Sequence, residues 1–370
     1  MGFWRRQKAP RGVTAVVGLM RGDSLHVLRG TRDPLDGSRT IHGEAVLRLD
    51  DFGRLATLLQ ERLGWSAEEP VYVGGPSPLM VGSALSLTVP RYEEGHAVVR
   101  DTREVLHEAQ WRAADTVREE AATYFGCPLE DIGAFGMSVE HWRETADGVA
   151  ATVFQLCGPR WGNTHPLAFP PDVPRAGAVT LPVLLADGVG SGDTPEAVFH
   201  VEDEFTALTV RHVNRLCRLR SLHIGMAMVR EHIEGALDCS PREAERLMAL
   251  APTGQLSANS QRTLDRILRT VLPLWSGMFQ VLAAGMPLAE RPRRLVVTGI
   301  FPRLVAKYFC RPHILSRSLG GPCSVDILPD DRGEASGLSP LLHAMLRHVT
   351  HEPRPVSRLP RVSLGVLTRT

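Results

Sequence analysis

Three adjacent acidic residues, Glu202, Asp203 and Glu204, separate two short runs in which apolar and other residues alternate. Alternation of this kind over 197–201 and 205–210 predicts the two strands of a β-hairpin. Carboxylates gathered at one point can bind Mg²⁺ or Ca²⁺. Three consecutive residues on a tight turn, however, cannot all point toward one ion. We therefore expect a solvated acidic turn and no metal site.

Other residue types that could do chemistry lack the spacing that the chemistry needs. Ser24 follows Asp23, but no G-x-S-x-G sequence presents a serine nucleophile. The stretch 187–192 is rich in glycine, but no Gly-Lys-Ser/Thr follows it, so it is not a P-loop. His200 falls on an expected buried strand, where we interpret it as a hydrogen-bonded core residue.

The composition excludes several classes of protein. The chain has 370 residues, of which 43% are hydrophobic and 22% charged, and its net charge is +1. These values are ordinary for a soluble globular protein and imply no nucleic-acid partner. The cysteines show no C-x-x-C pair, and no apolar run approaches the roughly 20 residues that span a membrane. We expect a cytoplasmic protein of two domains with reduced thiols.

Apolar periodicity and turn residues predict the elements that position these residues. We expect strands over 13–19, 25–28, 71–75, 84–89, 132–140, 149–157, 179–185, 197–201, 205–210, 293–299 and 324–328. We expect helices over 50–63, 101–125, 224–237, 261–272, 274–284 and 338–351, and one that starts at the Ser240 capping box. Strands alternating with helices predict the α/β class, in which 101–157 forms a small α-β-β unit.

The order of these elements resembles the actin-like ATPase fold, a ribonuclease H-like fold, and within it the bacterial branch of FtsA and PilM. Gly18–Ser24 resembles the family's first phosphate turn, and Ala197–Val210 resembles its second phosphate hairpin. His223–Met248 resembles the helices that follow, and Val296–Phe301 the strand and turn near the nucleoside.

The resemblance implies a two-lobed protein with a small inserted α-β-β subdomain. The expected division is a basic arm over 1–12, a first lobe over 13–192 with the insert at about 91–157, a second lobe over 193–337, a closing helix over 338–352 that returns to the first lobe, and a basic, proline-containing tail over 353–370.

In this family, glycines in the phosphate turns let backbone N–H groups approach ATP, and aspartates organise Mg²⁺ and the attacking water. The corresponding cleft positions here are Gly18, Met20, Gly22, Asp23, Ser24, His200, Glu202, Asp203, Glu204, Thr206, Glu245 and Gly299. Met20, His200 and Ala207 stand where the family has aspartates, and acids replace the glycines of the second turn. Each carboxylate near a phosphate charge adds about 1 kcal/mol of repulsion in water at ~4 Å. We expect a pseudo-ATPase with no catalytic residue and no cofactor.

The resemblance and the degenerate turns together imply a scaffold that docks a cytoplasmic peptide of an inner-membrane protein, in type IV pilus or type II secretion assembly. Two alternatives stay open: an FtsA-like cell-division protein that polymerises at the membrane, and a divergent ATP-dependent kinase or phosphatase of the same superfamily. The edge of the α-β-β unit at Thr152–Gln155 is the expected peptide-docking surface. Self-association is a further expectation.

The basic arm is expected to contact the membrane surface or a partner, since it combines aromatic and basic residues without an acid. Its residues are Phe3, Trp4, Arg5, Arg6 and Lys8. The protein would then be peripheral at the inner membrane.

Overall fold

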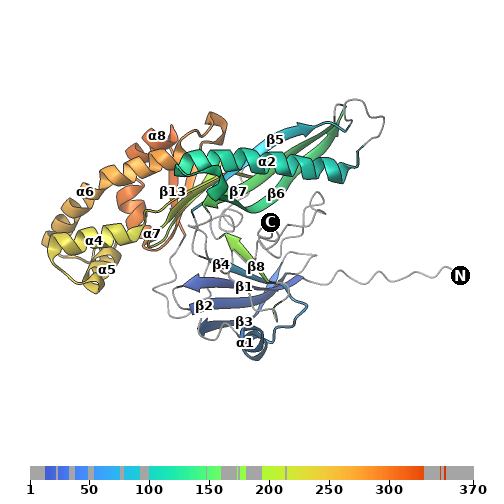
Figure 1. The fold of residues 1–370 in the computed structure, drawn as a ribbon. Helices are drawn as coiled ribbons and strands as arrows, with labels where there is room; N and C mark the ends of the chain where they lie inside the picture. The colour runs from blue at the N-terminus through green and yellow to red at the C-terminus, as the bar shows by residue number, and fades with distance from the viewer. Residues whose placement is uncertain are drawn as a thin grey trace. The chain divides into compact units, whose positions relative to one another are not determined.

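The computed structural model describes residues 13–21, 24–32, 38–48, 54–75, 79–91, 100–146, 148–159, 173, 176–180, 194–212, 215–328, 342 and 346. The chain divides into two compact units. Unit 1 comprises Met1–Gly75, His165–Val179 and Ser336–Pro355, and unit 2 comprises Pro76–Thr164, Thr180–Ala335 and Val356–Thr370. Each unit is built on one β-sheet with helices (Figure 1). The α/β class predicted from the sequence is confirmed.

Unit 1 contains a five-stranded sheet with the order β3-β2-β1-β4-β8. Its elements are β1 (Val13–Arg21), β2 (Ser24–Arg32), β3 (Arg39–Arg48), α1 (Leu55–Leu63), β4 (Val71–Gly75) and β8 (Ala176–Thr180). The hairpin of β1 and β2, helix α1 and strand β4 were all predicted, whereas β3 was not. Leu342 and Leu346, the described residues of the expected closing helix, are helical and fully buried.

Unit 2 contains an eight-stranded sheet with the order β13-β12-β9-β10-β11-β5-β7-β6. Its strands are β5 (Val81–Val89), β6 (Ile132–Thr145), β7 (Gly148–Pro159), β9 (Glu196–Val201), β10 (Thr206–His212), β11 (Arg215–Leu222), β12 (Arg294–Gly299) and β13 (Ser324–Ile327). Its helices are α2 (Thr102–Phe125), α4 (Met226–Leu237), α5 (Pro241–Leu250), α6 (Ala258–Ala283), α7 (Pro302–Leu304) and α8 (Pro312–Leu319), with helical turns at Leu129–Asp131, Leu288–Glu290 and Val305–Phe309.

The predicted α-β-β unit is present as α2, β6 and β7, and it shares its sheet with the expected second lobe. Strand β5 pairs with β7 on one side and with β11 on the other. For this reason the contact units group Pro76–Thr164 with the residues after 193, unlike the expected lobe boundary. The two compact units are defined by how residues pack together, and they do not test the boundaries of the actin-like lobes. The expected division into a first lobe over 13–192 and a second lobe over 193–337 stays a prediction.

The edge of this sheet is not where the sequence suggested. Strand β7, which contains Thr152–Gln155, lies between β5 and β6 and is paired on both sides. The prediction of an exposed edge at Thr152–Gln155 is therefore wrong. It assumed that the second strand of the insert was terminal, but β5 pairs with it from earlier in the chain. In the described part of the chain the sheet ends at β6 on this side and at β13 on the other.

Helix α6 is one helix and not the two segments expected on either side of Pro273. Proline removes one backbone donor from a helix interior and usually kinks or ends it. Here the buried stripe continues across it through Val271, Trp275 and Met278, and this packing offsets the missing hydrogen bond. Trp275 stacks on Phe309 with ring centroids 4.4 Å apart.

The helices of unit 2 pack on one face of its sheet (Figure 1). Residues directly opposite each other in an antiparallel ladder share a face. Arg220 is opposite Leu208, which packs under α4 and α6, and Arg218 is opposite Ser83, on the face that α2 covers. Arg218 and Arg220 therefore lie at the seam between α2 and the other helices.

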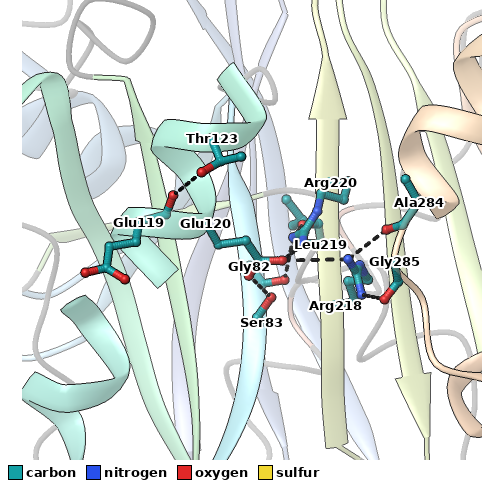
Figure 2. Close-up of polar contacts among 10 residues, drawn as sticks. All are labelled: Gly82, Ser83, Glu119, Glu120, Thr123, Arg218, Leu219, Arg220, Ala284 and Gly285. Carbon is teal, nitrogen blue, oxygen red and sulfur yellow. Dashed lines mark hydrogen bonds and ion pairs between the residues drawn. The ribbon is translucent and has the colours of Figure 1, made fainter. Parts of the chain in front are cut away.

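Polar contacts join the two sides of this seam (Figure 2). The carboxylate of Glu120, on α2, accepts hydrogen bonds from Arg220 and, at 2.7 Å, from Ser83. Arg218 lies 3.7 Å from the same carboxylate. It also donates to the carbonyls of Ala284 and Gly285, at 2.8 and 2.9 Å, just after the end of α6. One carboxylate thus ties the insert to the body of unit 2.

Burial makes this cluster energetically important. The side chain of Arg220 is only 3% exposed, whereas that of Glu120 is 37% exposed. Burial and the nearby charge of Arg218 lower the pKa of Arg220 to about 10, whereas the negative charge of Glu120 acts to raise this pKa. Arg220 stays charged at neutral pH, so it depends on Glu120 for its compensating charge.

Candidate functional site

The acidic turn lies between β9 and β10 and is held by its own backbone. Val201 is paired with Thr206, and the N–H of Glu202 donates to the Phe205 carbonyl at 2.8 Å. The hairpin predicted from apolar alternation is confirmed. Acidic residues can form this turn because the chain stays at negative φ; the residues with positive φ in the described part do not include any of the three acids.

The carbonyls of the turn face the first turn of α4. The N–H groups of Met226 and Ala227 donate to the carbonyls of Glu202 and Asp203, at 2.9 and 2.8 Å. The first N–H groups of a helix have no partner within the helix, and here the acidic turn satisfies two of them. The fit requires Gly225, because a Cβ at that position would overlap the Asp203 carbonyl oxygen.

The three carboxylates point to three different partners. Glu202 lies 2.6 Å from the Nε2 atom of His200, Asp203 lies 2.9 Å from Arg230, and Glu204 lies 3.8 Å from His223. Glu204 and His223 are both well exposed, so their pair contributes little to stability. No three His, Cys, Asp or Glu side chains in the described ranges are grouped so that they could hold a metal ion.

Arg230, on α4, connects the turn to α5. Besides Asp203, its guanidinium lies 3.4 Å from Glu245 and 3.6 Å from Glu234. Burial acts to lower the pKa of Arg230, but the hydrogen bond that it donates to Asp203 and the charges of the carboxylates raise this pKa above its ordinary value. Glu245, a position predicted from the resemblance, therefore belongs to an ion-pair network. The sequence reasoning missed Arg230, although its i,i+4 spacing to Glu234 on a predicted helix was visible.

His200 is fully buried, as expected for a core histidine. Its Nε2 atom faces Glu202, and its Nδ1 atom has no hydrogen-bond partner among the described residues. Ala207 is paired with His200 across the ladder and is also fully buried. The two positions where the family has aspartates on this hairpin thus carry an imidazole bonded to the turn and a methyl group.

Thr206 and Gly299 both contribute to contacts with backbone carbonyl groups around the turn. The Thr206 hydroxyl donates to the Ile224 carbonyl, just before α4. Gly299 ends β12 with φ of +101°, and the N–H of Ile300 donates to the Val201 carbonyl at 2.8 Å. A Cβ at Gly299 would overlap that carbonyl oxygen. These residues hold the turn, β12 and α4 together.

Two bulky residues of the nucleoside region are part of the core. Met248, where the family has a lysine over the nucleoside, is 1% exposed and packs in the main core of unit 2. Ile300 is 5% exposed and belongs to the same core. Both residues therefore belong to the apolar core of unit 2.

The remaining predicted cleft residues belong to unit 1. Gly18 is buried on β1 and lies opposite Val27. In the same ladder Met20 is paired with Leu25, and Ser24 begins β2. Gly22 and Asp23 lie outside the described residues. The two groups of predicted residues thus fall on different units, the first on the β1–β2 hairpin of unit 1 and the second around the β9–β10 turn of unit 2.

The residues of the basic arm, from Phe3 to Lys8, also lie outside the described residues, so membrane contact of the arm stays a prediction. In the part of the chain that the structure describes, no helix is both long and apolar enough to span a bilayer.

Comparison with known proteins identifies the fold. The chain matches no protein-family model and no curated protein sequence. A solved chain of the PilM-PilN type IV pilus biogenesis complex matches over 93% of this chain and 100% of its own length, with a TM-score of 0.55 and 15% identity.

Two further solved structures are similar at lower TM-scores. Ethanolamine utilization protein EutJ from Carboxydothermus hydrogenoformans has 12% identity and a TM-score of 0.40, covering 91% of each chain. An archaeal actin homologue has 11% identity and a TM-score of 0.40, covering 93% of this chain and 100% of its own. At 15% identity, similarity to the pilus-complex chain shows the fold and not the activity. The fold predicted from the sequence motifs is confirmed: the chain has the actin-like ATPase fold, in the form also found in the PilM-PilN pilus complex.

Proposed function

We propose that the protein is a non-catalytic cytoplasmic scaffold of type IV pilus or type II secretion assembly, a pseudo-ATPase that docks a peptide of an inner-membrane protein. The observation that carries the proposal is the acidic turn. Its carbonyls are bonded to α4, and the carboxylates of Glu202 and Asp203 are engaged by His200 and Arg230. A turn occupied in this way supports a structural role in place of phosphate binding.

Binding of ATP in the manner of the family would have to undo these contacts. The N–H of Glu202 is already bonded to the Phe205 carbonyl, and side chains stand where the family has glycines. Moving Asp203 away from Arg230 would break an ion pair of a half-buried arginine. Phosphate charges would meet three carboxylates in place of free N–H groups, so repulsion is added to the lost contacts.

A protein partner is supported by the similar solved structure, which is a type IV pilus biogenesis complex of PilM with PilN. Strand β6, which is terminal in the sheet of the described residues, offers a surface for such a partner. An extended peptide that adds to an edge strand gains backbone hydrogen bonds, and side-chain pockets give specificity. We place the docking surface on β6, from Ile132 to Thr145.

Calorimetry tests the loss of nucleotide binding. Titrating Mg-ATP into the protein is expected to give no measurable heat of binding, because acids occupy the phosphate turn and His200 and Ala207 replace two aspartates. ATP hydrolysis should equal that of buffer alone. The control is a variant with Glu202, Asp203 and Glu204 replaced by glycine, which removes the carboxylates. Tight Mg-ATP binding by the unmodified protein would overturn the pseudo-ATPase proposal and favour a kinase or phosphatase.

Proline substitutions on β6 test the docking surface. The N–H groups of adjacent residues on a strand point to opposite sides of the strand. Proline has no N–H group, so one of the two variants Arg143→Pro and Glu144→Pro breaks the ladder to β7. The other removes a hydrogen-bond donor from the side of β6 that faces away from β7. Met137→Pro and Ser138→Pro form the equivalent pair nearer the start of the strand. We expect one variant of at least one pair to keep its circular dichroism and melting temperature yet lose a membrane partner in pull-downs.

Capture of every membrane partner by all variants that stay folded would contradict docking on β6 and leave the pseudo-ATPase proposal intact. Filaments of the purified protein in electron micrographs would instead favour the cell-division alternative.

A further inference from the structure

The exposed side of helix α6 carries three arginines in its first half. Arg262, Arg266 and Arg269 have the i, i+4, i+7 spacing that places residues on one helix face. All three are exposed, and within the described residues none forms an ion pair. Arg262 donates only to the Ala258 carbonyl of its own helix, at 3.2 Å.

Two further cations adjoin these arginines. Lys307 and Arg311 lie 5.3 and 6.0 Å from the ring centroid of Tyr308. The Tyr308 hydroxyl donates to Asp265 on α6, at 2.7 Å, so the segment with Lys307 and Arg311 packs beside the arginines. We call the set of five the basic face: Arg262, Arg266, Arg269, Lys307 and Arg311.

Asp265, the acid that lies among these cations, interacts electrostatically with Lys307 and Arg269 and offsets only one unit of the charge of the basic face. The carboxylate of Asp265 already accepts hydrogen bonds from Tyr308 and from Gln261, at 2.7 and 2.9 Å. Elsewhere on unit 2 the pattern is different, since Arg230 lies near three carboxylates and Arg112 is paired with Glu108. Five cations around one engaged carboxylate make a strongly positive surface on a chain whose net charge is only +1.

The second half of α6 presents apolar residues beside the basic face. From Thr270 to Ala284 the helix carries no charged residue. Leu274 and Val281 are 47% and 45% exposed, and their i, i+7 spacing places them on one side. The apolar stripe of α6 packs in the core of unit 2, but exposed cations attract anionic lipids, and exposed apolar side chains add apolar area that a membrane surface can bury.

We propose that the basic face, together with Leu274 and Val281 of α6, binds the surface of an anionic lipid membrane. The five cations meet lipid phosphates, and the two apolar side chains enter the boundary with the acyl chains. Cations on an exposed helix face suit a fluid planar surface, because their long stems let each head find its own phosphate. The inference does not depend on the lost nucleotide binding or on the docking surface on β6.

Co-sedimentation of the full chain with vesicles tests the inference. The vesicles contain either phosphatidylcholine alone or phosphatidylcholine with about a third phosphatidylglycerol. We expect binding to the anionic vesicles only, and weaker binding as salt rises, because the Debye length falls from about 10 Å at 0.1 M to about 3 Å at 1 M. Replacing Arg262, Arg266 and Arg269 with glutamine should weaken the partition coefficient about a hundredfold, since each cation near such a surface contributes roughly fivefold.

A matched variant separates position from net charge. Arg62, Arg103 and Arg215 are also exposed and lie on α1, α2 and β11, so their replacement by glutamine removes the same charge away from the basic face. This control should bind vesicles nearly as the unmodified protein does. The double variant Leu274→Ser and Val281→Ser, which keeps all charges, should lose binding without changing its salt dependence.

Equal weakening by the two triple-glutamine variants, or binding that all these substitutions leave unchanged, would overturn the inference. Binding of an acidic peptide such as polyglutamate, without binding of anionic vesicles, would also overturn it and assign the basic face to a protein partner.

Discussion

Gly299→Ala is expected to destabilise the protein by about 2–5 kcal/mol. Two costs add at this position. The backbone φ of +101° is one that residues with a Cβ rarely adopt, which costs on the order of 1–2 kcal/mol. The new methyl group would also overlap the Val201 carbonyl oxygen, which accepts the hydrogen bond from Ile300. Displacing that carbonyl forfeits a buried hydrogen bond, worth about 1–3 kcal/mol, and opens the end of the β9–β12 ladder.

Two other glycines separate these costs. Gly254 has φ of +74°, but a Cβ there would meet no atom within 4 Å, so Gly254→Ala carries only the backbone strain. Gly277 lies inside α6 with open space around it and no positive φ, so Gly277→Ala should stabilise the helix by about 0.5–1 kcal/mol.

Urea denaturation followed by tryptophan fluorescence measures all three variants, since Trp275 is fully buried in the core of unit 2. If Gly299→Ala lowered the free energy of unfolding no more than Gly254→Ala does, the Val201 carbonyl would have to move aside at little energetic cost. The glycine would then be dispensable to the fold. The expected large loss means that Gly299 is retained for packing, although it aligns with a nucleotide motif.

Glu120→Gln is the second substitution with a large expected effect, about 3 kcal/mol of destabilisation. It leaves the guanidinium of Arg220, only 3% exposed, beside that of Arg218 without its ion-pair partner, with Glu290 as the other carboxylate whose charge acts on both arginines (Figure 2). Removing one member of a buried ion pair costs about 3–5 kcal/mol. We expect a loss at the lower end of this range, because the amide oxygen of glutamine can still accept a hydrogen bond.

The reverse substitution should cost less. In Arg220→Met, Glu120 keeps Arg218 at 3.7 Å and the Ser83 hydroxyl, and its exposed fraction lets water replace the rest. We expect about 1–2 kcal/mol, the usual range for replacing a buried residue by one of similar volume. Glu119→Gln is the matched control, because Glu119 is the neighbour of Glu120 on α2 but is exposed and has no ion pair in the described residues.

Denaturation midpoints of the two single variants and of their double variant give the coupling between Glu120 and Arg220. Equal losses for Glu120→Gln and Arg220→Met would contradict the argument from unequal burial. A loss for Glu119→Gln as large as that for Glu120→Gln would contradict the assignment of the effect to this cluster.

The elements that could be predicted from the sequence are those with a strong local signal. Helix α2 has an uninterrupted apolar stripe, α5 begins at the Ser240–Glu243 capping box, and β9 and β10 alternate cleanly. Strand β11 had no such signal, because Arg218 and Arg220 occupy its inward face. Their compensating carboxylate, Glu120, lies about a hundred residues earlier in the chain, so no local pattern reveals that the face is buried.

The same limit explains the errors in edge position and helix α6. Whether β7 is an edge depends on the pairing of β5, and whether α6 continues through Pro273 depends on partners such as Phe309. In the candidate site, the hairpin and the buried His200 followed from alternation alone. The hydrogen bonds between the turn and α4, and the ion pairs of Arg230, could not be predicted from the sequence. They join segments that are brought together only by the tertiary fold.

The continuous sheet of unit 2 has a mechanical consequence. A load applied to β6 passes through β7 and β5 before it reaches β11 and the helices. The β5–β11 ladder carries it on few residue pairs, since in the described residues Arg218, Leu219 and Arg220 alone are paired with β5. Glu120 accepts hydrogen bonds from Ser83 on β5 and from Arg220 on β11, so its contacts join the two strands at this short ladder. Under tension the insert should therefore yield as one piece at this ladder, leaving its own strands and the helical body intact.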